Sequence, residues 1–536
     1  MSPLPARPAT PRQVLTRILD QPNLVAAVQA LPAQALGKLI DHIGLEDAGE
    51  VVALASTEQL RRIFDDDLWR SERPGKDEQF DANRFALWLE IMLEAGEEFA
   101  ARKLADLPED LVTLALHKNV LVINIEALAI AASNRMSEDD GLTEKALESC
   151  LCEEIDEYRI ISRNHAGWDS LLAVLLALDR NSHDFLGRVL EHCCHMAAEF
   201  IDDNGGLYQV LTSDEMLESD VGAEREERRS EEGFIAPSGA ASFLALARTT
   251  DLASIVDAKA RDPVTHAYFR SLRGPTRPEV EHDIARNEAT ADVAALVEIL
   301  READVLPTSS PMLLLEGPSR AVDAQDSGVF THTMRELRMQ SASRHDQRMQ
   351  ELAYLANVLA AGCSMEGRNL RPLEAAHMAL ATCNLGLDHL LQAQSAPATA
   401  VAALENESAD KLFRIGWRLL TEQVVFPAAR AFEKRLTAQT RARDDSERAQ
   451  RLERAGRTLH SAITTGKPWL ALAKLTEIES TIETTTLLAL IDECPSLRGK
   501  LEVSPGAKEA AAEPRFLATR QQLRAVRAFL ADLPAT

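Results

Sequence analysis

The stretch LPAQALGKLIDHIGLEDAGEVVALASTEQLRRIFDDDLW, from Leu31 to Trp69, decides the fold class of this chain. Its apolar residues recur every three or four positions, which is the spacing of one face of an α-helix. Pro32 stands at the start of a first such segment and Gly44 at its end, both typical helix boundaries. The apolar stripe of this segment consists of Leu36, Leu39, Ile40 and Ile43.

Two more short helices are predicted directly after it. Residues 46–55 form the first, and Ser56 and Gln59 then have the spacing of a capping box, in which each side chain can bond the other residue's backbone N–H. Helices of about ten residues cannot each bury an apolar stripe alone, so they must stack as helical repeats do. The stripe of the helix that starts at the capping box consists of Leu60, Ile63, Phe64 and Leu68.

The same periodicity continues along the chain and predicts a mainly α fold, with an N-terminal layer of short helical repeats (α-solenoid-like) and a C-terminal helical bundle. Two short β-branched segments, near 119–125 and 157–162, fit either one small two-stranded sheet or buried helix turns. The expected parts are a disordered tail (1–12), a helical-repeat domain (13–118), a mostly helical middle domain (119–305), a linker or long loop (306–328) and the C-terminal helical bundle (329–536).

Composition and charge exclude several classes of protein. The 536 residues include 84 Asp and Glu against 58 Lys and Arg, a formal net charge of −26. This excess argues against a nucleic-acid partner, because phosphate binding needs clustered Lys and Arg. The longest strongly apolar run, Leu171–Leu178, is shorter than the roughly 20 residues needed to span a bilayer, so no membrane insertion is expected. Seven scattered cysteines and the lack of a secretory signal favour a reduced, cytoplasmic location.

The densest group of possible metal ligands is His192-Cys193-Cys194-His195. These residue types suit zinc, but four consecutive helical residues point in different directions and cannot surround one ion. The apolar stripe of this segment places Cys193 toward the core and both histidines on the opposite side. His192 and His195 therefore remain candidates for a surface site that needs further ligands from elsewhere.

The spacing Glu-x-x-His is half of a di-iron carboxylate site. It occurs as Glu279…His282 and as Glu374…His377, and with 13 histidines in the chain such spacings also arise by chance. Glu374 and His377 are kept as metal candidates because they stand in the segment that is richest in reactive side chains.

That segment, residues 362–388, is predicted to be a helix–turn–helix. It supplies thiols, a cation, carboxylates and an amide, so that a metal or catalytic site could form there. The two thiols on facing helices fit core packing equally well. The candidate residues are Cys363, Arg368, Glu374, Cys383, Asn384 and Asp388.

Two runs of charged residues are interpreted as solvated surface. Asp65–Asp67 stands at the C-terminal end of a predicted helix, where the helix dipole disfavours negative charge and either solvent or a bound cation would relieve it. Residues 224–232 place Glu224 four positions before Arg228, which favours an exposed helix.

Two resemblances add to these predictions. The segment LIDHIGLEDAGEVVALA, residues 39–55, is similar to the stacked short helices in the cytosolic part of MgtE-type magnesium transporters. The segment LAYLANVLAAGCSMEGR, residues 352–368, resembles a full-length bacterial family of unknown function, together with residues 85–98, 374–375 and 381–387. This second resemblance implies a mainly helical fold over most of the chain and no known activity, cofactor or catalytic residue. Because the chain lacks a membrane domain, control of an ion pathway in cis is not expected.

We therefore expect a non-catalytic helical scaffold for interaction or regulation, with protein partners. The cofactor and the oligomeric state are left open. The alternative is a metal-dependent enzyme or metal sensor with its site around residues 362–388.

Overall fold

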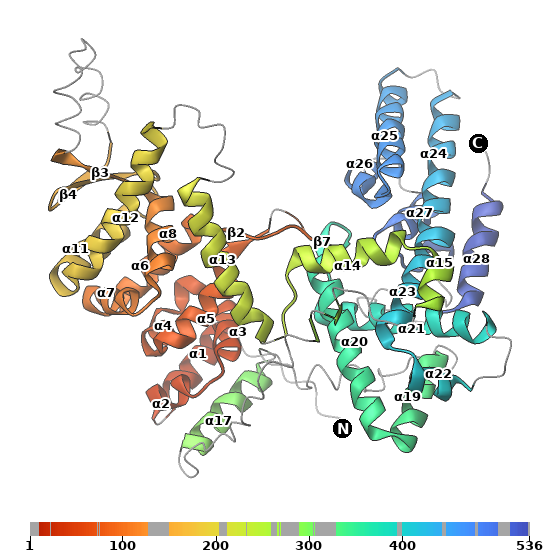
Figure 1. Cartoon of the computed structure of the whole chain (residues 1–536), viewed down its shortest axis with the longest axis horizontal. Helices are drawn as coiled ribbons and strands as arrows, with labels where there is room; N and C mark the ends of the chain where they lie inside the picture. Colours follow the sequence, from red (N-terminus) through yellow and green to blue (C-terminus); the bar gives the residue numbers. More distant parts are fainter. Residues whose placement is uncertain are drawn as a thin grey trace. The chain divides into compact units, whose positions relative to one another are not determined.

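The computed structural model describes residues 10–533, with the exception of 22, 72, 74, 127–149, 203–211, 232, 259–264, 267, 270–288, 304, 306–327, 394–398, 442–445, 477–480 and 502–514. The described chain is mainly helical, as predicted (Figure 1). It forms two compact units, each assembled from separate segments. The first comprises Met1–Arg70, Glu78–Arg229 and Thr276–Thr308, and the second comprises Ser71–Asp77, Ser230–Pro275 and Ser309–Thr536.

The first unit contains short stacked helices and a few strands. Among its described residues these elements are α1 (Pro11–Leu19), α2 (Leu24–Gln29), α3 (Ala33–Ile43), α4 (Gly49–Leu54), α5 (Thr57–Asp67), β1 (Trp69–Arg70), β2 (Gln79–Phe80), α6 (Ala82–Glu94), α7 (Glu97–Ala105), α8 (Glu109–Asn119), β3 (Val120–Asn124), β4 (Cys152–Ile155), β5 (Tyr158–Ser162), α11 (Trp168–Asn181), α12 (His183–Asp202), α13 (Ser213–Glu231) and α17 (Ala289–Glu302).

The predicted capping box forms at the start of α5. Ser56 Oγ accepts a hydrogen bond from Gln59 N at 3.1 Å, and Gln59 Oε1 accepts one from Ser56 N at 2.9 Å. The amide of Gln59 also donates to the carbonyls of Val28 and Leu31, both at 2.8 Å. One local motif thus both starts α5 and holds it against the end of α2.

Of the two alternatives for residues 119–125 and 157–162, the strand pair forms, and the sheet has a third strand that the sequence analysis missed. The strand order is β3-β5-β4, antiparallel throughout, with Val122 opposite Ile160 and Glu153 also opposite Ile160. The sequence of β4, CEEI, exposes its first three residues and carries two adjacent glutamates, so it shows none of the apolar alternation that identifies a strand.

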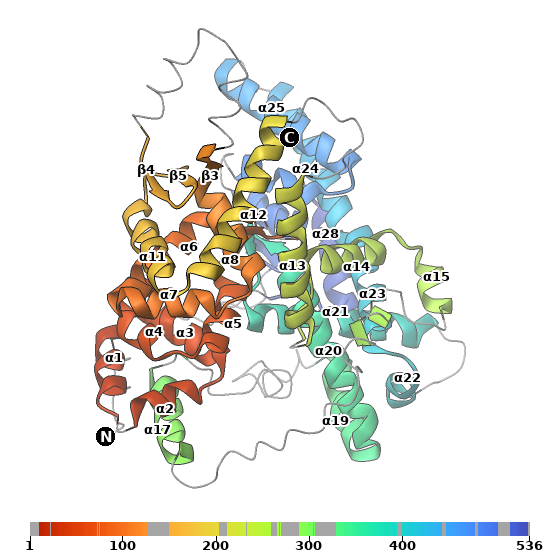
Figure 2. The same cartoon turned by 60° about the vertical axis from the view of Figure 1, so that its left-hand side comes forward.

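One apolar core extends across the border expected between residues 118 and 119. Leu114 of α8, Val122 of β3 and Leu175 of α11 all belong to it. Helix α17 packs on α1 and α2, beside which it lies in both views (Figures 1 and 2). The ion pair between Arg17 Nη2 and Glu302 Oε2, at 2.7 Å, joins α17 to α1.

The second unit is a helical bundle with one small hairpin. Its described elements are α14 (Pro237–Thr249), α15 (Leu252–Asp257), α19 (Val329–Gln340), α20 (Ala342–Gly362), β6 (Ser364–Met365), β7 (Arg368–Asn369), α21 (Pro372–Ala393), α22 (Ala400–Asn406), α23 (Ala409–Leu420), α24 (Phe426–Arg441), α25 (Ser446–Thr464), α26 (Leu472–Leu475), α27 (Ile482–Ile491) and α28 (Arg520–Ala531). A π-helical turn, Thr421–Val425, joins α23 to α24. Nearly all of the expected linker, residues 306–327, lies outside the described residues.

Helices α21 and α23 cross in close contact at two glycines. A Cβ atom added to Gly386 would lie 1.9 Å from the carbonyl oxygen of Leu412, and one added to Gly416 would lie 2.0 Å from the carbonyl oxygen of Thr382. Neither helix could therefore carry a side chain at the crossing. Within the parts of the chain described above, no helix is both long and apolar enough to cross a bilayer.

Candidate functional site

The segment between α20 and α21 brings Arg368 and Glu374 together. Arg368 Nη1 donates to Glu374 Oε2 and Nη2 donates to Oε1, both at 2.7 Å, while the backbone N–H of Arg371 donates to Oε2 at 2.8 Å. The guanidinium is the main cause of a lowered pKa of the Glu374 carboxyl, which therefore stays charged. Both carboxylate oxygens are thus used to hold the hairpin against the first turn of α21.

The two thiols of this segment are fully buried and lie in different contacts. The thiol of Cys383 donates to the carbonyl of Ala409 at 3.5 Å. The thiol of Cys363 is hydrogen-bonded to the thiol of Cys494, and both cysteines are free. Burial raises the pKa of both Cys363 and Cys383, which disfavours the thiolate that binds metals. His377 of α21 is half-buried. Among the described residues, three potential ligands come within reach of one ion at Asp156, Asp179 and His183, a group that includes none of the predicted metal candidates.

Asn384 and Asp388 hold the C-terminal segment of the bundle. Asn384 Oδ1 accepts from the backbone N–H of Phe330 at 2.8 Å, and its Nδ2 donates to the carbonyl of Ala518 at 2.6 Å. Asp388 Oδ2 accepts from the backbone N–H of Arg520 at 3.4 Å. These two side chains thus connect α21 to the start of α19 and to the first turn of α28.

The hairpin β6–β7 is held by two acidic residues that the sequence analysis missed. The carboxylate of Asp492 accepts hydrogen bonds from the backbone N–H of Glu366, at 2.9 Å, and from that of Cys494, at 3.1 Å. Glu493 accepts the backbone N–H of Ser364 at 3.1 Å and pairs with Arg248 at 2.9 Å. Nothing in the local sequence marks these residues, because their partners are far apart along the chain.

The burial of Asp492 predicts a pH-dependent stability of the second unit. Desolvation raises its pKa from 3.8 to about 6. Between these two pKa values, the folded chain holds a proton on Asp492 that the unfolded chain has released. Protonation of Asp492 therefore stabilises the fold fully below the unfolded pKa, and this stabilisation is lost as the pH rises through about 6. Between about pH 4.5 and pH 7, the wild type should lose about 2 kcal/mol more than Asp492→Asn does. Urea unfolding at both pH values measures this, and equal losses in the two proteins would contradict it.

The core of the second unit contains an ion pair that the sequence analysis also missed. Arg348 and Glu351 of α20 are 2% and 0% exposed. Arg348 Nη1 donates to both carboxylate oxygens, at 2.8 and 2.7 Å, and Nε donates to the carbonyl of Leu404 at 2.8 Å. The backbone N–H of Ala409 donates to Glu351 Oε2 at 2.8 Å. The pair thus joins α20 to the end of α22 and the start of α23.

The histidines of α12 lie as the helix periodicity predicts. His192 and His195 are exposed, whereas Cys193 is buried, where desolvation raises its pKa to about 12. His192 Nδ1 lies 3.8 Å from a carboxylate oxygen of Glu109 in α8. The other predicted half-motif, Glu279…His282, lies outside the described residues.

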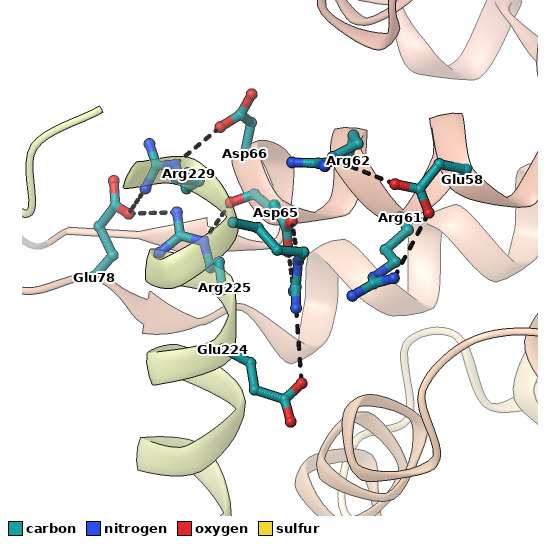
Figure 3. Close-up of polar contacts among 10 residues, drawn as sticks. Glu58, Arg61, Arg62, Asp65, Asp66, Glu78, Glu224, Arg225 and Arg229 are labelled. Atoms are coloured by element: carbon teal, nitrogen blue, oxygen red, sulfur yellow. Dashed lines mark hydrogen bonds and ion pairs between the residues drawn. The ribbon is translucent and has the colours of Figure 1, made fainter. Parts of the chain in front are cut away.

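The prediction of a solvated face in α13 holds for its exposed glutamates, such as Glu224 and Glu227, but is wrong for its arginines. Figure 3 shows Arg225 directed at Asp65 of α5, and Arg229 directed at Asp66 and Glu78. Arg225 is 2% exposed, donates to the carbonyl oxygen of Asp65 and to Glu78, and lies 4.9 Å from the ring centroid of Trp69. Arg229 bonds Glu78 at 3.0 Å. We call Asp65, Glu78, Arg225, Arg228 and Arg229 the arginine clamp.

The carboxylates of Asp65–Asp67 are likewise neutralised by arginines rather than by solvent alone. Arg228 Nε and Nη2 donate to the two carboxylate oxygens of Asp65 at 2.9 and 2.7 Å. Arg84 binds both oxygens of Asp67, at 2.6 and 2.9 Å. These cations supply the positive charge that the C-terminal end of α5 favours.

Removing the charge of Asp65 should weaken the arginine clamp. Asp65→Asn is expected to lower the free energy of unfolding by about 2 kcal/mol, because hydrogen bonds between charged groups are the stronger ones. Glu224→Gln is the matched control, since this carboxylate lies 3.7 Å from Arg228 but is 59% exposed. It should cost less than about 0.5 kcal/mol. Calorimetric melting compares the two, and an equal cost would contradict a buried role for Asp65.

Comparison with known proteins gives a match in the N-terminal part of the chain. Residues 6–199 fit the model of a family of unknown function, DUF6178. No curated protein and no solved structure matches the chain. This match supports the resemblance to a family of unknown function for residues 6–199, a segment that ends within α12. The matched segment does not reach residues 352–387, and the similarity to MgtE-type transporters stays a prediction.

Proposed function

We propose that this protein is a non-catalytic helical scaffold for interaction or regulation, with protein partners in the cytoplasm. One observation carries the proposal: side chains suited to catalysis or metal binding serve as ties between helices. Glu374 is held by Arg368 at 2.7 Å through both oxygens, Asn384 joins α19 to the segment before α28, and Arg228 joins α13 to α5. A catalytic group needs an atom that is available to substrate, and these atoms are used within the fold.

The charge of the chain indicates the kind of partner. With a formal net charge of −26, the protein should associate with basic or neutral surfaces. Charge-assisted encounters are screened by salt within a Debye length of about 8 Å at physiological ionic strength. Stacked short helices, such as α3 to α5, supply the extended type of surface that repeat proteins use for binding.

Enrichment of the tagged full-length chain from its native cells tests this proposal. We expect to recover a partner in stoichiometric amount. When the salt concentration is raised first and the complexes are then cross-linked, the recovery of this partner should fall steeply. Recovery of no such partner at low salt, together with a clean monomer on sizing, would overturn the proposal.

Elemental analysis of the purified chain tests the alternative, an enzyme or metal sensor around residues 362–388. The scaffold proposal expects no stoichiometric metal that depends on Cys363 or Glu374. A bound metal that is lost in Cys363→Ala or Glu374→Ala would reverse the ranking of the two functions.

A further inference from the structure

We propose that Asp156, Asp179 and His183 form a surface site for a divalent transition-metal ion such as Zn²⁺. Asp156 stands in the turn between β4 and β5, Asp179 near the end of α11, and His183 at the start of α12. One potential ligand atom from each lies within 4.8 Å of the others. This site lies far along the chain from residues 362–388, and the inference does not rest on the scaffold proposal.

The two ring nitrogens of His183 have different surroundings. Nδ1 lies 2.9 Å from Asp179 Oδ1, a hydrogen-bond distance, whereas Nε2 lies 3.7 Å from Asp156 Oδ2, beyond that range. Metal-binding histidines usually donate one ring N–H to a carboxylate, which fixes the tautomer and directs the other nitrogen at the ion. Asp179 is therefore the positioning residue, while His183 and Asp156 provide the ligands.

The separation of the two ligands suits an ion placed between them. Two ligands of a tetrahedral Zn²⁺, with bonds of about 2.0 Å, lie roughly 3.3 Å apart. The observed 3.7 Å requires only a small closure of the exposed side chains, which are 58% exposed for His183 and 48% for Asp156. Water can occupy the remaining positions, and an imidazole–carboxylate set favours Zn²⁺ over Mg²⁺, which prefers oxygen ligands.

The charge around the site favours a cation. The carboxylates of Asp179 and Asp156 lie 2.9 and 3.7 Å from the two ring nitrogens of His183, so two negative charges flank the position that an ion would take. A divalent cation is attracted by both charges.

Titration of the metal-free full-length chain with Zn²⁺ alone tests the site, with calorimetry for affinity and Co²⁺ absorption for geometry. We expect one ion per chain, with affinity lowered about 10-fold or more in His183→Gln and Asp156→Asn. Asp179→Asn should weaken binding about 10-fold while leaving an ion bound, since this residue acts through His183.

The matched control is His192→Gln, because His192 is an exposed histidine of the same helix that also faces a carboxylate, Glu109. Its affinity should equal that of the wild type, and circular dichroism should show all variants folded. Unchanged affinity in His183→Gln, loss of the ion in His192→Gln instead, or no stoichiometric binding to the wild type would each overturn the proposal.

Discussion

Replacement of Gly416 by alanine is expected to destabilise the second unit by about 3 kcal/mol or more. The new methyl group would lie 2.0 Å from the carbonyl oxygen of Thr382, which belongs to the backbone of α21 and cannot rotate away. The helices would have to separate, and the packing on both sides of the crossing would be lost. Alanine favours helix by about 1 kcal/mol over glycine, so the steric cost decides the sign.

Gly456 provides the matched control for this substitution. It lies within α25, and apart from the backbone of its own helix no atom of the described residues lies within 4 Å of a Cβ built on it. Gly456→Ala should therefore stabilise the chain by up to about 1 kcal/mol through helix propensity alone. Calorimetric melting of both variants separates the two effects, and a Gly416→Ala protein that melts at or above the wild-type temperature would contradict the close crossing.

Removal of the Glu351 carboxylate should cost about 3–5 kcal/mol, because it leaves a buried guanidinium without its counter-charge. Arg348 is 2% exposed and would keep only the carbonyls of Leu404 and Glu405 as partners in its described contacts. The backbone N–H of Ala409, which donates to Glu351 at 2.8 Å, would also lose its acceptor. We expect Glu351→Ala to lower the denaturant midpoint accordingly.

An exposed ion pair in the same unit serves as the control. Glu453 and Arg457 of α25 lie 3.9 Å apart and are 57% and 71% exposed, so Glu453→Ala should cost less than about 0.5 kcal/mol. The double variant Arg348→Met, Glu351→Leu should lose less stability than Glu351→Ala, since no buried charge remains. If Glu351→Ala behaved like Glu453→Ala, the buried pair would not stabilise the fold.

Features that depend on neighbouring residues were predictable from the sequence. The capping box of Ser56 and Gln59, the helix stripes between Leu31 and Trp69, and the β-branched strands β3 and β5 all arise from spacings of a few residues. Such spacings place side chains on one face before any tertiary contact forms. The strand β4 was missed because Glu153 and Glu154 give it no apolar alternation.

For the candidate site residues, the sequence supplied the residue types but not, in most cases, their hydrogen-bond partners. Arg368 and Glu374 stand six positions apart, so their ion pair could be predicted from the local sequence. Asn384, by contrast, bonds Phe330 and Ala518, which are 54 and 134 positions away. The sequence pattern does not distinguish an asparagine that binds a ligand from one that forms hydrogen bonds between helices.

The sequence by itself therefore determined a mainly helical chain of short amphipathic helices with a strong negative charge. Only the tertiary structure decided which charges are buried: Asp65 meets Arg228 across 163 positions, and Arg225 of α13 becomes an internal contact, whereas Glu224 stays exposed. The physical reason is that amphipathicity is a local, repeating property of the chain. The partner of a buried charge, in contrast, is fixed by which helices pack together once their apolar faces have been removed from water.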